Sequence, residues 1–143
     1  MHTSLPPPPP AFVFPVRVYY EDTDAGGVVY YANYLRFCER ARTEWLRALG
    51  VEQQRLLAER GALFVVRHVR ADYLAPARLD DSLTVESTIH DMRNVSVLFS
   101  QRIFREDKLL FTAEVKIVSV SSAAGRPIPW PDAVRAQLSP LSS

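Results

Sequence analysis

The chain has 143 residues, enough for one domain with its own hydrophobic core, and it is 48% hydrophobic and 23% charged. A formal net charge of +1 leaves no electrostatic footprint for nucleic acid, and no apolar run approaches the roughly 18 residues of a membrane span. The single cysteine, Cys38, cannot form an intrachain disulfide, and the N-terminus lacks the pattern of a secretory signal, so we expect a cytoplasmic protein.

The N-terminal segment contains five consecutive prolines in "MHTSLPPPPPAF". Such a run favours a stiff polyproline II conformation without a packed core. We therefore predict a flexible, proline-rich arm over residues 1–12, a disordered extension rather than a recognition arm for a partner's groove. A single domain follows over residues 13–143.

The first regular elements are a strand and a long helix. Residues 13–21 are rich in β-branched and aromatic types, which favours a strand. A helix of about 16 residues follows, with Asn33 as its N-cap and Gly50 as its stop. A short polar helix is expected over 53–60, ended by Gly61. The predicted buried face of the long helix is Tyr34, Cys38, Ala41, Trp45 and Ala48.

After residue 61 the hydrophobic period changes to two. Strands are predicted over 62–74, 82–90, 95–105 and 108–122, joined by short turns. A proline-rich turn and one or two helical turns after Asp132 close the chain. The order strand, helix, four strands predicts an α+β fold in which an antiparallel five-stranded sheet wraps around one long helix. A single helix leaves part of such a sheet for a second subunit.

The segment "DTDAGGVVYYANY" at residues 22–34 raises the question of function. A calcium loop would need side-chain ligands where Gly26 and Asn33 stand, and no GK[ST] follows the glycines as a phosphate-binding loop requires. The three histidines have no partner at zinc-ligand spacing, and we expect neither a metal nor a cofactor.

Two aspartates of this segment receive different interpretations. Asp22 is interpreted as a turn residue, since Asp and Gly commonly form turns. Asp24 precedes apolar residues that lead directly into a helix N-terminus. Unpaired N–H groups and the helix dipole favour negative charge there. A carboxylate beside such amides predicts acyl transfer, with Asp24 as base or nucleophile next to an oxyanion site.

Four segments carry a resemblance to a known family. They are "VRVYYEDTDAGGVVYYANYLRFCERARTEWLRALG", "ADYLAPARLDDSLTVES", "MRNVSVLFSQRI" and "RPIPWPDAVRA". In order and spacing they resemble the Tol-Pal-associated acyl-CoA thioesterases of the hotdog-fold superfamily, which also contains the bacterial 4-hydroxybenzoyl-CoA thioesterases. The resemblance covers residues 14–138. It implies a hotdog fold and the hydrolysis of acyl-CoA thioesters to free acid and CoA.

The resemblance also implies roles for particular residues. Asp24 matches the essential carboxylate, and the backbone amide of Tyr31 matches the donor that polarises the thioester carbonyl. Tyr20 matches a strand tyrosine near the site, with simple packing as its alternative role. Asn33 and Arg93 complete the expected substrate-binding residues. Arg93 either contacts the CoA phosphates or is an exposed hairpin arginine.

The chain departs from its relatives at Tyr31, where many Tol-Pal-associated proteins have histidine; the hydroxybenzoyl branch has tyrosine. This departure motivates an alternative, a non-catalytic module that binds acyl thioesters or proteins. The resemblance implies a homodimer or homotetramer with the site between subunits. An acyl carrier protein or a Tol-Pal-linked partner follows from the resemblance alone.

Overall fold

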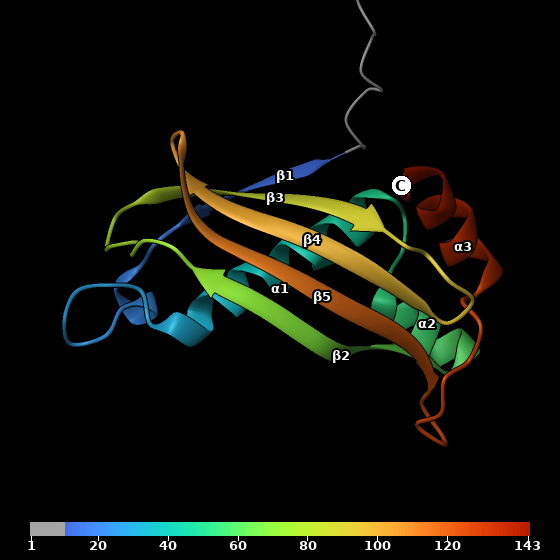
Figure 1. Ribbon diagram of the computed structural model, residues 1–143. Coiled ribbons are helices and arrows are strands. Elements are labelled where there is room, and N and C mark those ends of the chain that lie inside the picture. Colours follow the sequence, from blue (N-terminus) through green and yellow to red (C-terminus); the bar gives the residue numbers. More distant parts are fainter. Residues whose placement is uncertain (1–10) are drawn as a thin grey trace, which may run out of the picture.

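The computed structural model describes residues 11–143 (Figure 1). Residues 1–10 of the predicted proline arm lie outside the described part. The sheet is antiparallel throughout, with strand order β1-β3-β4-β5-β2. This confirms the predicted five-stranded antiparallel sheet. Its strands are β1 (Phe12–Arg17), β2 (Ala62–Tyr73), β3 (Ser82–His90), β4 (Ser96–Arg105) and β5 (Lys108–Ser121).

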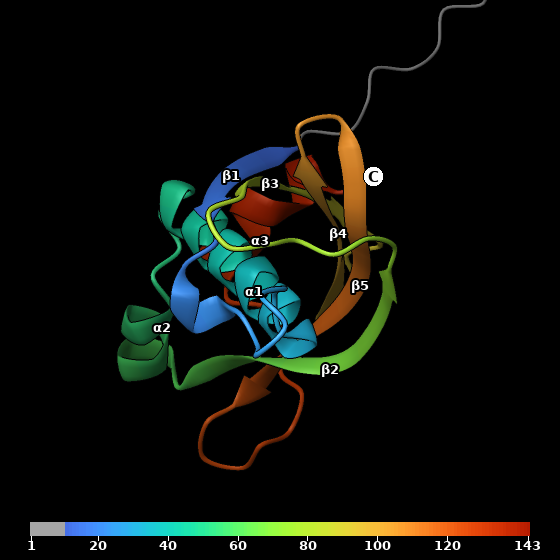
Figure 2. The same cartoon turned by 90° about the vertical axis from the view of Figure 1, so that its left-hand side faces the viewer.

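Three α-helices accompany the sheet in the described residues. The 18-residue α1 (Tyr31–Ala48) lies in the concave face, and the sheet curls around it (Figure 2). Two short helices, α2 (Gln53–Arg60) and α3 (Asp132–Leu138), lie near the far end of α1 (Figure 1). Gly61 ends α2 at a φ of +62°, a conformation that favours glycine, as predicted. Within residues 11–143, no helix has the length and apolar character that crossing a membrane requires.

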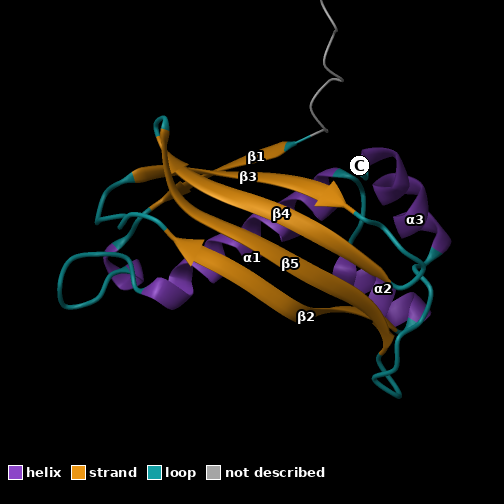
Figure 3. Cartoon of the chain, viewed as in Figure 1, coloured by secondary structure: helices purple, strands orange, loops and turns teal. Residues whose placement is uncertain are grey.

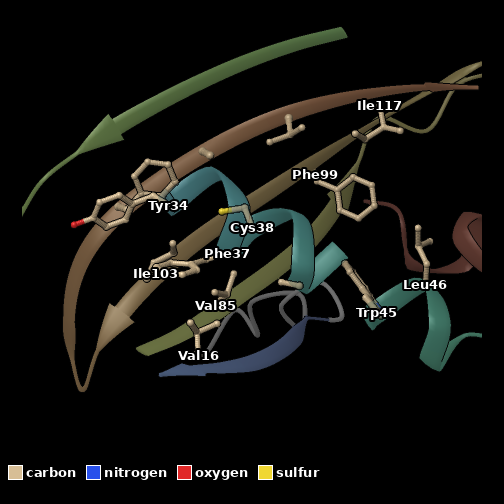
Figure 4. Close-up of a cluster of buried hydrophobic side chains, with 14 of the residues drawn as sticks. Val16, Tyr34, Phe37, Cys38, Trp45, Leu46, Val85, Phe99, Ile103 and Ile117 are labelled. Carbon is tan, nitrogen blue, oxygen red and sulfur yellow. The ribbon is translucent and has the colours of Figure 1, made fainter. Parts of the chain in front are cut away.

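The core forms between α1 and the inner face of the sheet (Figure 4). Tyr34, Cys38 and Trp45 are buried, as the helical spacing predicts, and so is Ala41. The prediction for Ala48 is wrong: this last residue of α1 is exposed, and the buried face continues through Leu46 instead. The ring of Trp45 packs edge-on against Phe99 of β4, with centroids 6.0 Å apart, so the helix is fixed to the sheet by aromatic contact.

The first strand is shorter than predicted. It ends at Arg17, and Tyr20–Asp22 form a 3₁₀ turn in place of the strand expected to residue 21. The Val18 N–H donates to the Asp81 carbonyl and the Tyr19 N–H donates to the Asp22 carboxylate (2.9 Å each). The backbone donors are thus taken by a loop and a side chain instead of a strand partner, although the residues themselves favour β structure.

Two fully buried serines of the sheet differ in hydrogen bonding. Ser119 Oγ has no hydrogen-bond partner in the described structure, whereas Ser87 Oγ accepts from Gln101 Nε2 at 2.9 Å. A buried hydroxyl without a partner loses its hydrogen bonds to water and gains none in the protein, which lowers the stability of the fold. We expect Ser119→Ala to raise the free energy of unfolding in urea by about 1 kcal/mol and Ser87→Ala to lower it by a similar amount. Equal losses in both variants would show that Ser119 Oγ does have a partner.

Candidate functional site

The segment of residues 22–30, called here the Asp loop, lies at one end of the sheet beside the loop of residues 75–81 (Figure 3). The Val29 N–H donates to the Ala77 carbonyl at 2.8 Å, and Val28 forms an antiparallel bridge with Arg78. The Ala77 N–H in turn donates to the Tyr34 hydroxyl at 2.9 Å. Backbone contacts therefore hold the Asp loop against the loop of residues 75–81, and the Tyr34 hydroxyl connects that loop to the start of α1.

Asp22 anchors this loop from inside the protein. It is 5% exposed, and its Oδ2 accepts the Tyr19 N–H at 2.9 Å. Its other oxygen accepts from Asn33 Nδ2 at 3.3 Å, and its backbone carbonyl accepts the Tyr30 N–H at 2.9 Å. Asp22 does lie in a turn, the 3₁₀ turn Tyr20–Asp22, but unlike a typical turn aspartate it is not solvated. It is a buried carboxylate whose acceptors are used to fix the chain.

Asp24 is exposed and forms the turn itself. Its Oδ1 accepts the Gly26 N–H at 2.8 Å, and its carbonyl accepts the Gly27 N–H at 3.1 Å. A Cβ at position 26 would lie 3.3 Å from that oxygen, and Gly27 has a φ of +78°, so both glycines fit the turn closely. Oδ2 has no partner among the described residues. One oxygen is thus held in place by the turn, and the other makes no hydrogen bond to residues 11–143.

The start of α1 differs from the prediction. The helix begins at Tyr31, and Asn33 is its third residue, not its N-cap. The Asn33 side chain instead donates to the backbone and the carboxylate of Asp22, so a tertiary contact uses its capping group. No side chain caps the helix at Tyr30. The N–H groups of Tyr31 and Ala32 have no acceptor in residues 11–143, and such donors favour an anion.

Exposed tyrosines surround this helix start. Tyr31 is 64% exposed and Tyr20 is 82% exposed, and neither is packed into the core. The Tyr73 hydroxyl donates to the Tyr31 carbonyl at 3.0 Å, and partial burial raises the pKa of the Tyr73 phenol. The sequence analysis did not predict that Tyr73, the last residue of β2, contacts the start of α1. Its position just before the loop of residues 75–81 could have indicated this contact.

Arg93 does not lie at the end of the sheet where the Asp loop lies. It follows β3, whose nine residues span about 30 Å from the end of the sheet where the Asp loop lies (Figure 1). Its Nε donates to the Asp91 carboxylate at 3.1 and 3.2 Å. Arg93 and Asp24 of one chain therefore lie at opposite ends of the sheet.

Cys38 is a core residue. It is fully buried on α1, and burial raises the pKa of its thiol to about 12. At pH 8 we expect a colorimetric disulfide reagent to react with folded protein at least about a thousandfold more slowly than with the unfolded chain, because only the thiolate reacts. Rapid labelling of the folded protein would contradict this burial. If Cys38 does not react, the same reagent can measure CoA released from thioesters without a contribution from the protein.

Metal-binding side chains do not gather near the Asp loop. Among residues 11–143, no group of three or more histidine, cysteine, aspartate or glutamate side chains is arranged to hold a metal ion. The polar groups nearest the start of α1 include the Asp24 carboxylate, the backbone N–H groups of Tyr31 and Ala32 and the exposed phenol of Tyr31.

Comparisons with known proteins identify the family of the chain. The model of the thioesterase-like superfamily matches residues 18–138. The acyl-CoA thioesterase YbgC of Haemophilus influenzae is 50% identical over 125 residues, covering 87% of this chain and 92% of that protein. The acyl-CoA thioester hydrolase YbgC of Escherichia coli is 53% identical over 138 residues, covering 96% of this chain and 98% of that protein.

Solved structures of related proteins have the same fold as this chain. A 1,4-dihydroxy-2-naphthoyl-CoA thioesterase from Synechocystis superposes with a TM-score of 0.86 at 25% identity, covering 92% of this chain and 98% of that chain. The hotdog fold implied by the sequence resemblance is thereby confirmed. The chain belongs to the thioesterase-like superfamily, and it is a thioester hydrolase.

Proposed function

We propose that the protein hydrolyses acyl-CoA thioesters to the free acid and CoA at the Asp loop. The observation that carries the proposal is that one short segment, residues 24–32, holds both an Asp24 oxygen and backbone N–H groups at the start of α1 that have no partner in the described residues. The Asp24 N–H donates to the Val28 carbonyl at 2.9 Å, which keeps the carboxylate within the segment that enters the helix. The names of the relatives support acyl-CoA as the substrate class.

The Tyr31 N–H would donate a hydrogen bond to the carbonyl oxygen of the thioester and so stabilise the negative charge that develops on it. Asp24 then acts in one of two ways. As nucleophile it attacks the carbonyl carbon, releases CoA thiolate and leaves a mixed anhydride that water hydrolyses. As general base it takes a proton from water, which attacks the same carbon, and the departing thiolate is protonated. The products are identical in both routes.

Neighbouring residues would hold these groups in position. Asn33 is 7% exposed and donates to Asp22, so we propose that it positions the Asp loop instead of contacting the substrate. Tyr73 would hold the first peptide of α1 through the Tyr31 carbonyl. Tyr20 is exposed beside the loop and remains a proposed contact for the acyl-CoA.

We further propose that the site is shared in a homodimer or homotetramer. The edge strand β2 has twelve residues whose outer side pairs with no strand in residues 11–143. Val66, Val69 and Tyr73 on it are 51%, 37% and 47% exposed, an apolar row that water would solvate poorly in a lone chain. Pairing two such edges would cover that row and bring the partner's Arg93 end toward Asp24.

The role of Tyr31 provides a test at the site. If its contribution is the backbone N–H, Tyr31→Phe should change kcat/KM by less than about threefold, and Tyr31→His should bring no large gain. If its phenol contacts the thioester or the attacking water, phenylalanine should cost about 1–3 kcal/mol of transition-state stabilisation. Steady-state kinetics on aliphatic and aromatic acyl-CoAs separates the two.

The same variants test the binding-module alternative. A parent protein that is inert on every acyl-CoA, but becomes active with histidine at position 31, would overturn the proposed function. In that case the fold would serve to bind thioesters without turnover.

A further inference from the structure

The Asp loop is held against the loop of residues 75–81, called here the support loop, which joins β2 to β3. The Val29 N–H donates to the Ala77 carbonyl at 2.8 Å, and Val28 forms an antiparallel bridge with Arg78. Both contacts fall on the middle of the support loop, where the chain has neither helix nor strand. The position of the Asp loop therefore depends on how the middle of the support loop is held.

Arg105, the last residue of β4, reaches the support loop from the sheet. Its Nη1 donates to Asp81 Oδ2 at 2.9 Å and to the Pro76 carbonyl at 3.2 Å. Asp81 Oδ2 also accepts the Arg78 N–H at 2.8 Å, so the shared carboxylate connects the guanidinium to the middle of the loop. In the described part of the chain, no other hydrogen bond joins residues 76–79 to a strand of the sheet. Figure 1 shows the turn between β4 and β5 at the same end of the sheet as the support loop.

The Arg105–Asp81 ion pair is more enclosed than the other ion pairs of the described residues. Its side chains are 30% and 22% exposed, whereas those of Arg102 and Glu86, the next most enclosed pair, are 52% and 30% exposed. Solvent screens exposed ion pairs, so most of them constrain the structure little. Hydrogen bonds between ionised groups are stronger where water is partly excluded, and the Arg105–Asp81 pair is suited to hold a loop in one position.

We propose that Arg105 and Asp81 are positioning residues for thioester hydrolysis. Their ion pair holds the support loop, and through it the Asp loop, in the geometry that turnover requires. The inference rests on the hydrolysis proposed above for Asp24. A displacement of a reacting group by about 1 Å can lower a rate by about a hundredfold, although the substrate still binds. Loss of the pair should therefore lower kcat and leave KM nearly unchanged.

The Asp loop has a second anchor that does not depend on this pair. Asp22 accepts from the Tyr19 N–H at 2.9 Å and from Asn33 Nδ2 at 3.3 Å, and its carbonyl accepts the Tyr30 N–H at 2.9 Å. These bonds fix both ends of the Asp loop beside α1. Without the ion pair, we therefore expect the loop to shift on the support-loop side while the fold persists.

The kinetic test uses steady-state hydrolysis of acyl-CoA by the full-length protein. Arg105→Met should lower kcat by about 10- to 100-fold with KM within about threefold of the parent, and Arg105→Lys, which keeps a cation, should recover most of the loss. Adding Asp81→Asn to Arg105→Met should lower kcat by less than about a further threefold, because the two residues act as one unit. The matched control is Arg102→Met, which removes the arginine of the Glu86 pair from the same strand and should leave kcat unchanged.

Amide hydrogen exchange, followed by NMR, tests the same link without substrate. In Arg105→Met the Val29 N–H should exchange about tenfold or more faster than in the parent, while the amides in the centre of β5 keep their protection. Arg102→Met should change neither.

The two measurements separate the inference from the proposed function. A parent protein inert on acyl-CoA, with faster Val29 exchange in Arg105→Met, would overturn the proposed function and support the link between the ion pair and the Asp loop. An unchanged kcat or an unchanged Val29 exchange rate in Arg105→Met would overturn the inference, and so would an equal loss of kcat in Arg102→Met or a loss confined to KM.

Discussion

Asp24→Asn is expected to lower kcat by about 10²–10⁴-fold while leaving stability unchanged. Asparagine keeps the shape of the side chain and can still accept the Gly26 N–H, so the turn survives. It cannot attack a thioester as a carboxylate does or take a proton from water. The measurement is kcat from free-thiol release, with the free energy of unfolding in urea measured on the same preparation.

Asp22→Asn is the matched control, because the two aspartates lie two residues apart in opposite environments. The buried Asp22 accepts from Tyr19 and Asn33, and an amide NH₂ would face the Asn33 donor instead of accepting from it. We expect Asp22→Asn to lose about 1–3 kcal/mol of stability and to keep most of its kcat below its unfolding temperature. A normal kcat in Asp24→Asn, or equal losses of kcat in both variants, would remove Asp24 from the mechanism.

Val69→Lys is expected to prevent the proposed assembly and to give a monomer with less than about a tenth of the parent activity. Val69 lies on the free edge strand β2, 37% exposed. In a symmetric assembly the substitution enters the interface twice, and an unpaired buried charge costs several kcal/mol. That cost corresponds to a rise of about a thousandfold or more in the dissociation constant. Light scattering at micromolar concentration measures the mass.

The control for this variant lies on the opposite edge of the sheet. Val13 on β1 is 58% exposed, and Val13→Lys should leave both mass and activity unchanged. A parent protein that is a stable, active monomer would contradict both the assembly and the shared site. Loss of assembly in Val13→Lys alone would place the interface at β1.

The sequence predicts well what depends on local periodicity. The strands after residue 61 alternate regularly, and their observed bounds differ from the predicted ones by one residue at most. The helix N-terminus was misjudged because tertiary bonds decide it: the Tyr30 N–H is taken by Asp22, and the helix starts directly afterwards. The same bonds decide which aspartate is buried, and no spacing along the chain encodes that outcome.

Hydrogen bonds between side chains and partners far away in the sequence could not be predicted either. Tyr73 is 42 residues from the Tyr31 carbonyl it contacts, and Arg42 is 59 residues from Gln101. Arg42 follows Cys38 by four residues and precedes Trp45 by three, so helical spacing places it on the buried face, although an arginine there would ordinarily extend its charged end into solvent. Only the curvature of the sheet around α1 brings β4 close enough to bury it.

The most direct test of the central claim is the release of CoA and free acid from a panel of aliphatic and aromatic acyl-CoAs by the purified parent protein, with Asp24→Asn alongside. Both products should form in equal amounts from at least one thioester. The Asp24→Asn protein should bind that thioester with similar affinity and turn it over at least about a hundredfold more slowly. A parent protein that binds acyl-CoA and releases neither product, or an Asp24→Asn protein that matches it, would contradict Asp24-dependent hydrolysis.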